Sequence, residues 1–94
     1  MSRGATSPES ILDEHAEDLA AATDPAVVNR ARETLDEWRM HHYGFNPRGG
    51  VAAAVYEATL VEDADLRQAD VSELFGVSAA TLRKRFHELA EFRD

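Results

Sequence analysis

The sequence predicts an all-α fold, and three features of the chain support this. Apolar residues recur every three or four positions in five separate stretches, which is the spacing of amphipathic helices. Three of these stretches open on a capping residue followed by proline, in the pairs "SP", "DP" and "NP", a common helix start. No stretch alternates apolar and polar residues as a half-buried strand does.

The chain has 94 residues, which is enough for one domain at most. We expect residues 1–7 to be a disordered N-terminus and residues 8–94 to form a single domain. Helices are predicted over 8–22 and 25–42, and Ser7 and Asp24 are their caps. Their inward faces are expected to comprise Ile11, Leu12, Ala16, Leu19, Val27, Ala31, Leu35 and Trp38.

The stretch "NPRGGVAAAVYEA" (residues 46–58) allows two interpretations, a glycine-rich phosphate loop or a helix with an unusually small surface. A phosphate loop needs a strand before its glycines and commonly a lysine after them, and neither is present around Gly50. We therefore predict a third, central helix over 47–61, buried on all sides. Its first face is expected to comprise Val51, Ala54, Val55, Ala58 and Val61, with Leu60 on another apolar face.

Two shorter helices follow, over 67–75 and 79–92. Gly76 is expected to make the bend between them, because glycine adopts the left-handed conformation at low cost. Ser78 is the predicted cap of the last helix. A helix, a glycine turn and a second helix make a helix-turn-helix over 67–92.

The charge distribution is uneven. The chain holds 18 acidic and 10 basic residues, for a net charge of −8, and Lys84 is the only lysine. Such a composition favours a protein that works in molar salt, and an ordinary acidic protein rich in arginine is the alternative. Residues 66–94 hold five acids and five bases, so the acid excess lies entirely in residues 1–65.

The start of the last helix is the predicted DNA-binding surface. In a helix-turn-helix this part of the second helix enters the major groove, and here it presents Ala79, Ala80, Arg83 and Lys84. Arginine can bond a guanine edge with two hydrogen bonds, and alanine permits close approach or contact with a thymine methyl group. The alternative is that the basic cluster is a solvated face of two paired helices.

The stretch from "NPRGGVAAAVYEA" to "VSAATLRKRFHELAEF" resembles the C-terminal cyclin-like repeat of the family of archaeal transcription factor B and eukaryotic transcription factor IIB. The segment "HAEDLAAATDPAVVNRARETLDEW" is similar to the first two helices of that repeat, so the resemblance covers nearly the whole chain. It implies a five-helix cyclin-like fold whose last two helices contact the promoter element beside the TATA box.

The resemblance also implies individual contacts. Arg83 and Ala80 stand where the family contacts bases, although the family usually has valine at the position of Ala80, so the element bound is expected to differ or to be read more loosely. Gln68 matches a family glutamine, while Arg67 replaces a threonine cap and weakens that helix start or adds a phosphate contact. The full set of predicted DNA-binding residues is Arg67, Gln68, Ser78, Ala79, Ala80, Thr81, Arg83, Lys84 and Arg85.

Other kinds of site find little support. No cysteine is present, so thiolate metal sites and disulfides are excluded. His41 and His42 are adjacent and point in different directions on a helix, and His15 is expected at the edge of the core. No nucleophile stands beside a base, so we expect no enzyme, no cofactor and no metal. No apolar run is long enough for a membrane helix, and we expect a cytoplasmic protein.

The sequence therefore predicts a DNA-binding transcription factor or regulator that contacts promoter DNA through its last helix. The alternative is a cyclin-fold adaptor that contacts transcription proteins without touching DNA. Promoter DNA is the expected partner, and the TATA-binding protein and other transcription proteins are candidates. The zinc ribbon and the first cyclin repeat of the family are absent from this sequence, which favours a small regulator, a competitor of the full factor or a fragment.

Overall fold

The computed structural model describes residues 7–39 and 47–93. Within these residues the protein forms five helices and no strand, so the all-α prediction is confirmed. The helices are α1 (Pro8–Ala22), α2 (Pro25–Arg39), α3 (Pro47–Val61), α4 (Gln68–Phe75) and α5 (Ala79–Arg93). The expected last three residues of the second helix, 40–42, lie outside the described residues. No helix in the described part of the chain is long and apolar enough to cross a membrane.

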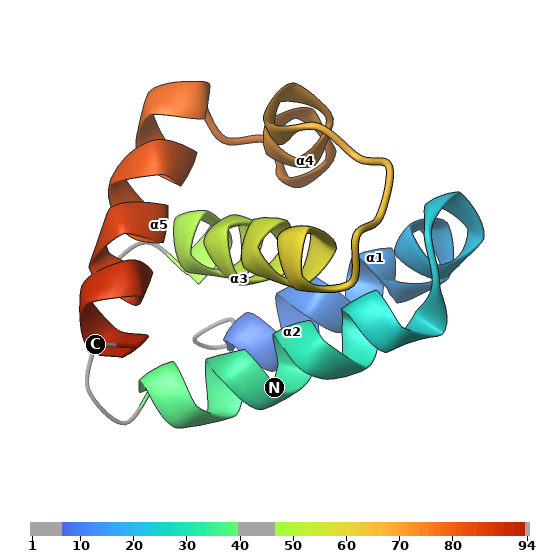
Figure 1. Cartoon of the computed structure of the whole chain (residues 1–94), viewed down its shortest axis with the longest axis horizontal. Helices are drawn as coiled ribbons and strands as arrows, with labels where there is room; N and C mark the ends of the chain where they lie inside the picture. Colours follow the sequence, from blue (N-terminus) through green and yellow to red (C-terminus); the bar gives the residue numbers. More distant parts are fainter. Residues whose placement is uncertain (1–6, 40–46, 94) are drawn as a thin grey trace, which may run out of the picture.

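Helix α3 is the centre of the fold, as the sequence predicts. It packs against each of the other four helices: α1 and α2 lie on one side, α4 lies opposite, and α5 crosses near the start of α3 (Figure 1). Its residues from Gly49 to Val55 are all buried. Because most of these side chains are alanine or absent, neighbouring helices can approach the α3 backbone closely.

The last turn of α3 differs from the prediction. Leu60 and Val61 are each 55% exposed, so two predictions are wrong at this turn: that the helix is buried on all sides, and that Val61 belongs to the inward face. The chain reverses at Asp63, which adopts a φ of 56°, and the amide of Ala64 donates to the carbonyl of Thr59. Ala64 in the returning segment then packs against the core. The last turn of α3 therefore projects beyond its neighbours.

Local hydrogen bonds fix the starts of the first two helices. The hydroxyl of Ser7 accepts from the amide of Ser10 at 3.1 Å, and the carboxylate of Asp24 accepts from the amide of Ala26 at 2.8 Å. Both residues are the caps that the sequence predicts. Each side chain accepts a hydrogen bond from a backbone amide that has no carbonyl partner within its own helix.

The buried side chains form two clusters. The larger one joins all five helices and contains most of the inward residues of α1 and α2, five residues of α3, and Val71, Phe75 and Leu82. The smaller one consists of Trp38, Ala53 and Leu89, with Phe86 and Phe92 packed against it. Helix α5 is therefore attached to the body at two places, through Leu82 and through Leu89.

Candidate nucleic-acid interface

The turn between α4 and α5 is closely hydrogen-bonded. Gly76 adopts a left-handed conformation with a φ of 68°, and its amide donates to the carbonyl of Glu73 at 3.2 Å. The amide of Val77 donates to the carbonyl of Ser72 at 3.0 Å, which satisfies a second carbonyl at the end of α4. Ser72 is buried, so its small side chain lets the helix pack closely at this point. These hydrogen bonds fix the end of α4 and the turn that leads into α5.

Ser78 begins α5 as predicted. Its hydroxyl oxygen accepts from the amide of Thr81 at 3.0 Å, and its hydroxyl lies 3.0 Å from the hydroxyl of Thr81. The cap orders the first turn of α5 and stays exposed to solvent.

The first half of α5 presents one continuous exposed face. Ala79, Ala80, Arg83 and Lys84 are all exposed, and their spacing places them on one side of the helix. In the described part of the chain, neither Arg83 nor Lys84 forms an ion pair with a carboxylate. We call these four residues, with Ser78, the α5 front. The structure brings together the residues that the sequence places on the leading part of the last helix.

Thr81 and Arg85 lie on a different side of α5, against α3. A Cβ atom built on Gly49 would lie 3.0 Å from Cγ2 of Thr81 and 3.3 Å from Cγ of Arg85. One guanidinium nitrogen of Arg85 donates to both carboxylate oxygens of Glu88, at 2.8 and 3.0 Å, and the Arg85 side chain is only 20% exposed. Among the predicted DNA-binding residues, these two are therefore at the α3–α5 contact and not on the α5 front.

The start of α4 carries the other two predicted residues. Arg67 is the N-cap, and Asp70 accepts a hydrogen bond from its backbone amide at 3.1 Å. Asp70 thus supplies half of a capping box although the usual threonine cap is missing. The Arg67 side chain is 85% exposed, whereas Gln68 is half-buried.

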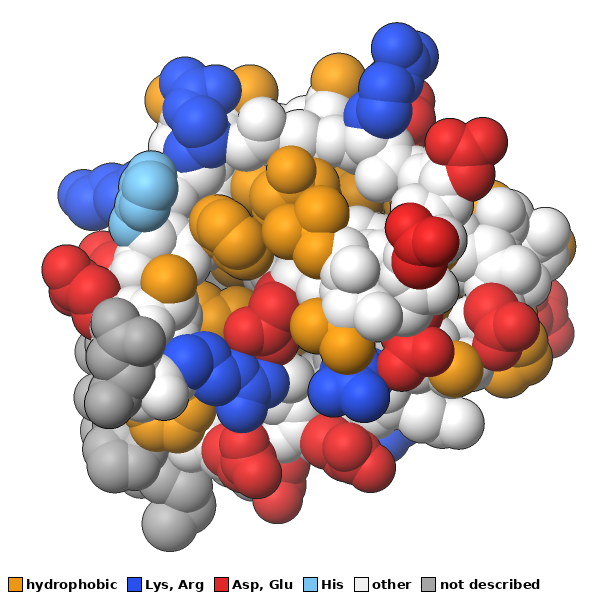
Figure 2. Space-filling model, in the orientation of Figure 1, with side chains coloured by type: hydrophobic (Ala, Val, Ile, Leu, Met, Phe, Trp, Pro, Cys, Tyr) orange, Lys and Arg blue, Asp and Glu red, His pale blue; other side chains and the backbone are white. Residues whose placement is uncertain are grey.

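Basic and acidic side chains gather on different parts of the surface, as they do in different parts of the sequence. Figure 2 shows Lys and Arg side chains over the first half of α5 and near the start of α4, with hydrophobic side chains gathered where α3, α4 and α5 meet. Tyr56 and Phe86 make an edge-to-face contact at this meeting point, with ring centres 5.1 Å apart. Asp and Glu side chains predominate over the lower and right-hand parts of the same view. Phosphate groups would be attracted to one edge of this face and repelled by the rest.

The remaining candidates do not form a competing site. His15 packs edge-on against Phe75 with ring centres 4.8 Å apart, whereas His41 and His42 lie outside the described residues. Gly49 and Gly50 are buried in the first turn of α3, as the packing interpretation requires. The described residues contain no group of three or more side chains placed to hold a metal ion. A shallow depression of about 350 Å³ is lined by Glu9, Arg32, Glu33 and Asp36, and its acidic lining disfavours phosphate.

Sequence reasoning missed one polar network. Arg93, in the last described turn of α5, reaches Glu57 of α3 and both Thr34 and Glu37 of α2. Its partners lie 36 to 59 positions from Arg93 in the chain, so no local spacing indicates that they meet it. The only sequence signal is the charge of Glu57, the one acidic residue of α3, which interrupts an otherwise apolar stretch.

Comparison with known proteins identifies a family. Residues 2–92 match the family described as "Transcription factor TFIIB repeat". The chain is 40% identical to "Transcription initiation factor IIB 6" of Halobacterium salinarum, over 93% of this chain and 27% of that protein. It is 33% identical to "Transcription initiation factor IIB 2" of Haloferax volcanii, over 93% and 26%. With "Transcription initiation factor IIB" of Pyrococcus furiosus it shares 37% identity, over 89% and 28%. The chain thus spans roughly a quarter of the length of these relatives.

Proposed function

The chain belongs to the transcription factor TFIIB repeat family, and we propose that it contacts promoter DNA by placing the α5 front in the major groove. Members of this family are transcription factors and not enzymes. The observation that carries the proposal is the α5 front itself. Arg83 and Lys84 are exposed there without a carboxylate partner in the described part of the chain, although the chain as a whole carries a net charge of −8.

Each residue of the α5 front has a distinct proposed role. The planar fork of Arg83 suits the two acceptors on a guanine edge, O6 and N7. Ala79 and Ala80 leave the helix backbone free to approach the bases, and their methyl groups can contact a thymine methyl group. Lys84 and the exposed Arg67 side chain are suited to phosphate, because phosphate contacts depend on charge more than on geometry. The Gln68 amide is a further phosphate donor at the start of α4, whereas the Ser78 hydroxyl donates to Thr81 and holds the first turn of α5 in place.

Thr81 and Arg85 have an indirect role in this proposal. Both side chains are held at the contact between α3 and α5, where Gly49 leaves room for them. The pairing of Arg85 with Glu88 further occupies its guanidinium. We therefore assign them to setting the distance between α3 and α5, and not to base contacts.

The acidic body limits how the protein can approach DNA. A chain of net charge −8 is repelled by phosphate unless its basic edge leads, and in molar salt the Debye length of about 3 Å removes most long-range attraction. Binding must then rest on base contacts and burial, or on a protein that anchors the chain. The TATA-binding protein is the anchoring candidate that the family relationship suggests.

A fluorescence anisotropy titration tests the proposal. TATA-flanking promoter duplexes are titrated in molar potassium chloride, with and without the TATA-binding protein. Arg83→Ala should lower affinity by about 1–3 kcal/mol, because it removes a bidentate base contact. Arg32→Ala is the matched control: it changes the net charge by the same amount, but Arg32 lies on α2 and binds Asp13. Equal losses in both variants would contradict specific contact by Arg83.

The acidic surface also favours a second candidate, an adaptor that contacts transcription proteins without touching DNA. The titration distinguishes the two functions. Negligible binding by the wild-type chain and by Arg83→Ala, with and without the TATA-binding protein, would support the adaptor. The search would then turn to protein partners of the exposed apolar pair Leu60 and Val61.

A further inference from the structure

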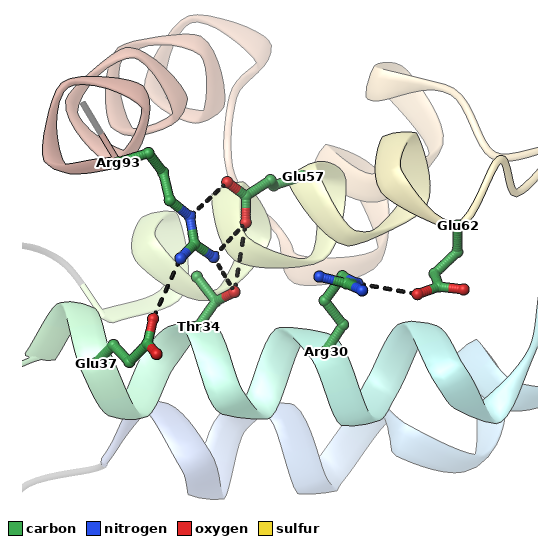
Figure 3. Close-up of polar contacts among 6 residues, drawn as sticks. All are labelled: Arg30, Thr34, Glu37, Glu57, Glu62 and Arg93. Atoms are coloured by element: carbon green, nitrogen blue, oxygen red, sulfur yellow. Dashed lines mark hydrogen bonds and ion pairs between the residues drawn. The ribbon is translucent and has the colours of Figure 1, made fainter.

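Arg93 joins three helices at one point. Figure 3 shows its guanidinium between α2, α3 and α5. Nε and Nη2 donate to the two carboxylate oxygens of Glu57 at 3.0 and 2.9 Å. Nη2 also donates to the hydroxyl of Thr34 at 2.7 Å, and Nη1 donates to Glu37 at 3.1 Å. The Thr34 hydroxyl in turn donates to Glu57 at 3.3 Å, which closes the network.

This network is more than a surface ion pair. The Glu57 side chain is only 16% exposed and Thr34 is 1% exposed, whereas Arg93 is 36% exposed. The fork-to-fork geometry of Arg93 and Glu57 restricts the angle between them as well as the distance. Hydrogen bonding to Glu57 raises the pKa of Arg93, although burial opposes this, so the guanidinium remains charged at any ordinary pH. Partly buried pairs are also screened by salt less than exposed ones.

The network lies where α5 otherwise has little support from α2. The backbones of these two helices approach each other sparsely, so side chains make the connection. Trp38 of α2 packs against Leu89 of α5 in the smaller core cluster, and Phe92 packs against its edge. Arg93 adds the polar contacts one turn beyond Leu89. The smaller apolar cluster and the Arg93 network together hold the C-terminal half of α5 against α2 and α3.

The contacts at the C-terminal end of α5 influence how its first half, which carries Arg83, is oriented. Ten residues separate Arg93 from Arg83, which is a lever of about 15 Å along the helix axis. Leu82, the neighbour of Arg83, is itself buried in the larger cluster, so a change at Arg93 tilts α5 about Leu82 and turns the Arg83 side chain by the same angle. Hydrogen bonds to base edges tolerate only a few tenths of an ångström around 2.9 Å, so such a tilt weakens base contacts before it weakens phosphate contacts.

We propose that Arg93 is a positioning residue, which fixes the angle of α5 against α2 and α3 and so sets the pose in which the α5 front meets the bases. The effect on DNA rests on the proposed function, whereas the angle of α5 is a property of the free protein. The two parts can therefore be tested separately.

The angle of α5 is tested in the free protein by double electron–electron resonance, which measures the distance between two spin labels. The chain contains no cysteine, so spin labels can be attached at Asn29→Cys on α2 and Ala80→Cys on α5, both of which are exposed. Arg93→Ala and, from the other side of the bridge, Glu57→Gln should broaden or shift the distance distribution. Arg93→Lys should give an intermediate effect, because lysine keeps the charge but lacks the planar fork. Circular dichroism and a cooperative melt identify any variant that fails to fold.

Arg30→Ala is the matched control. It breaks an ion pair of 2.9 Å between α2 and the residue after α3, Glu62, without involving α5 (Figure 3). The distance distribution should not change in this variant. An unchanged distribution in folded Arg93→Ala, or the same change in Arg30→Ala, would overturn the proposal.

The consequence for DNA is measured with unlabelled protein on matched and mismatched duplexes. Arg93→Ala should lower the ratio of the two affinities by about 2- to 30-fold, while the salt dependence of non-specific binding stays the same. A change in the α5 angle with an unchanged ratio would overturn the link to base contact. If the wild-type chain binds no DNA, the proposed function fails, and the spin-label distances still decide whether Arg93 fixes α5.

Discussion

Gly76 is the residue on which the junction of α4 and α5 depends most directly. It adopts a φ of 68°, and no atom lies within 4 Å of the position where a Cβ would be. Any loss on substitution must therefore come from backbone strain and not from a clash. Gly76→Ala should lower the free energy of unfolding by about 1–2 kcal/mol, since a side chain disfavours the left-handed conformation. Urea denaturation of the two proteins gives this value.

Gly76→Asn serves as the control for this prediction. Asparagine adopts the left-handed conformation more readily than alanine does, so Gly76→Asn should lose less stability than Gly76→Ala although its side chain is larger. If the asparagine variant were the less stable of the two, side-chain packing and not backbone strain would govern this turn.

At the residue scale, local interactions are predictable from sequence and tertiary ones are not. The roles of Ser7, Asp24, Gly76 and Ser78 follow from short-range chemistry, because each acts within three or four positions of itself. By contrast, the location of Arg85 depends on the close approach of α3 and α5.

The contacts of Arg93 show even more clearly that tertiary contacts cannot be predicted from sequence. Its hydrogen bonds reach residues 36 to 59 positions away. From sequence alone, a charged residue at the end of a helix is expected to be exposed to solvent. Helical spacing can show that a side chain lies on one face of a helix, but not which other helix that face meets.

At the scale of elements, the five helices follow their start and stop signals closely. Proline at the first helical position and a capping residue before it mark the starts of α1 and α2. The inward position of Val61 was a wrong expectation. The helical spacing of α3 continues to its end, but the chain reversal at Asp63 lies beyond any spacing argument. An apolar pattern therefore predicts a face, and the neighbouring helices decide how far along the helix that face is covered.

The start of α5 allows the stability of an element to be separated from its proposed function. Ser78→Ala should lower the free energy of unfolding by about 1 kcal/mol, because the amide of Thr81 loses its partner. Ser78→Asp preserves a cap and should keep the stability near that of the wild type. The same substitution places a negative charge on the α5 front, so promoter affinity should fall in the aspartate variant. Thermal melts and anisotropy titrations of both variants check the two expectations. High promoter affinity in Ser78→Asp would indicate that DNA does not contact the α5 front.

At the scale of the whole molecule, the acid excess has a consequence for stability. With 18 acidic and 10 basic residues, like charges repel each other in the folded state at low salt. The melting temperature should therefore rise between dilute buffer and molar potassium chloride. Salt can also stabilise proteins through apolar burial, so the control is a variant that neutralises exposed acids of α1, Glu14→Gln, Glu17→Gln and Asp18→Asn.

The neutralised variant should show a smaller rise in melting temperature than the wild type. An equal rise would assign the salt effect to apolar burial. A wild-type chain that is more stable in dilute buffer would contradict the hypothesis of adaptation to molar salt.

The fold and the family were predictable because they depend on patterns that extend over the whole chain. The family match covers residues 2–92, and the uneven charge of the sequence corresponds to the separation of basic and acidic side chains on the surface (Figure 2). The α5 front could also be placed, since its exposed residues share one helical face. The angle of α5 against the body could not, because it is set by contacts between distant residues such as Arg93 and Glu57.

The central claim is that the α5 front touches bases, and site-specific crosslinking tests it most directly. Because the chain has no cysteine, single cysteines can be introduced at Ala80 on the α5 front and, as a control, at the exposed Glu17 on α1. Each protein is mixed with a TATA-flanking duplex that carries a thiol-tethered base, together with the TATA-binding protein. Disulfide formation at position 80 with none at position 17 is the predicted result. Equal crosslinking at both positions, or crosslinking at position 17 alone, would contradict the claim.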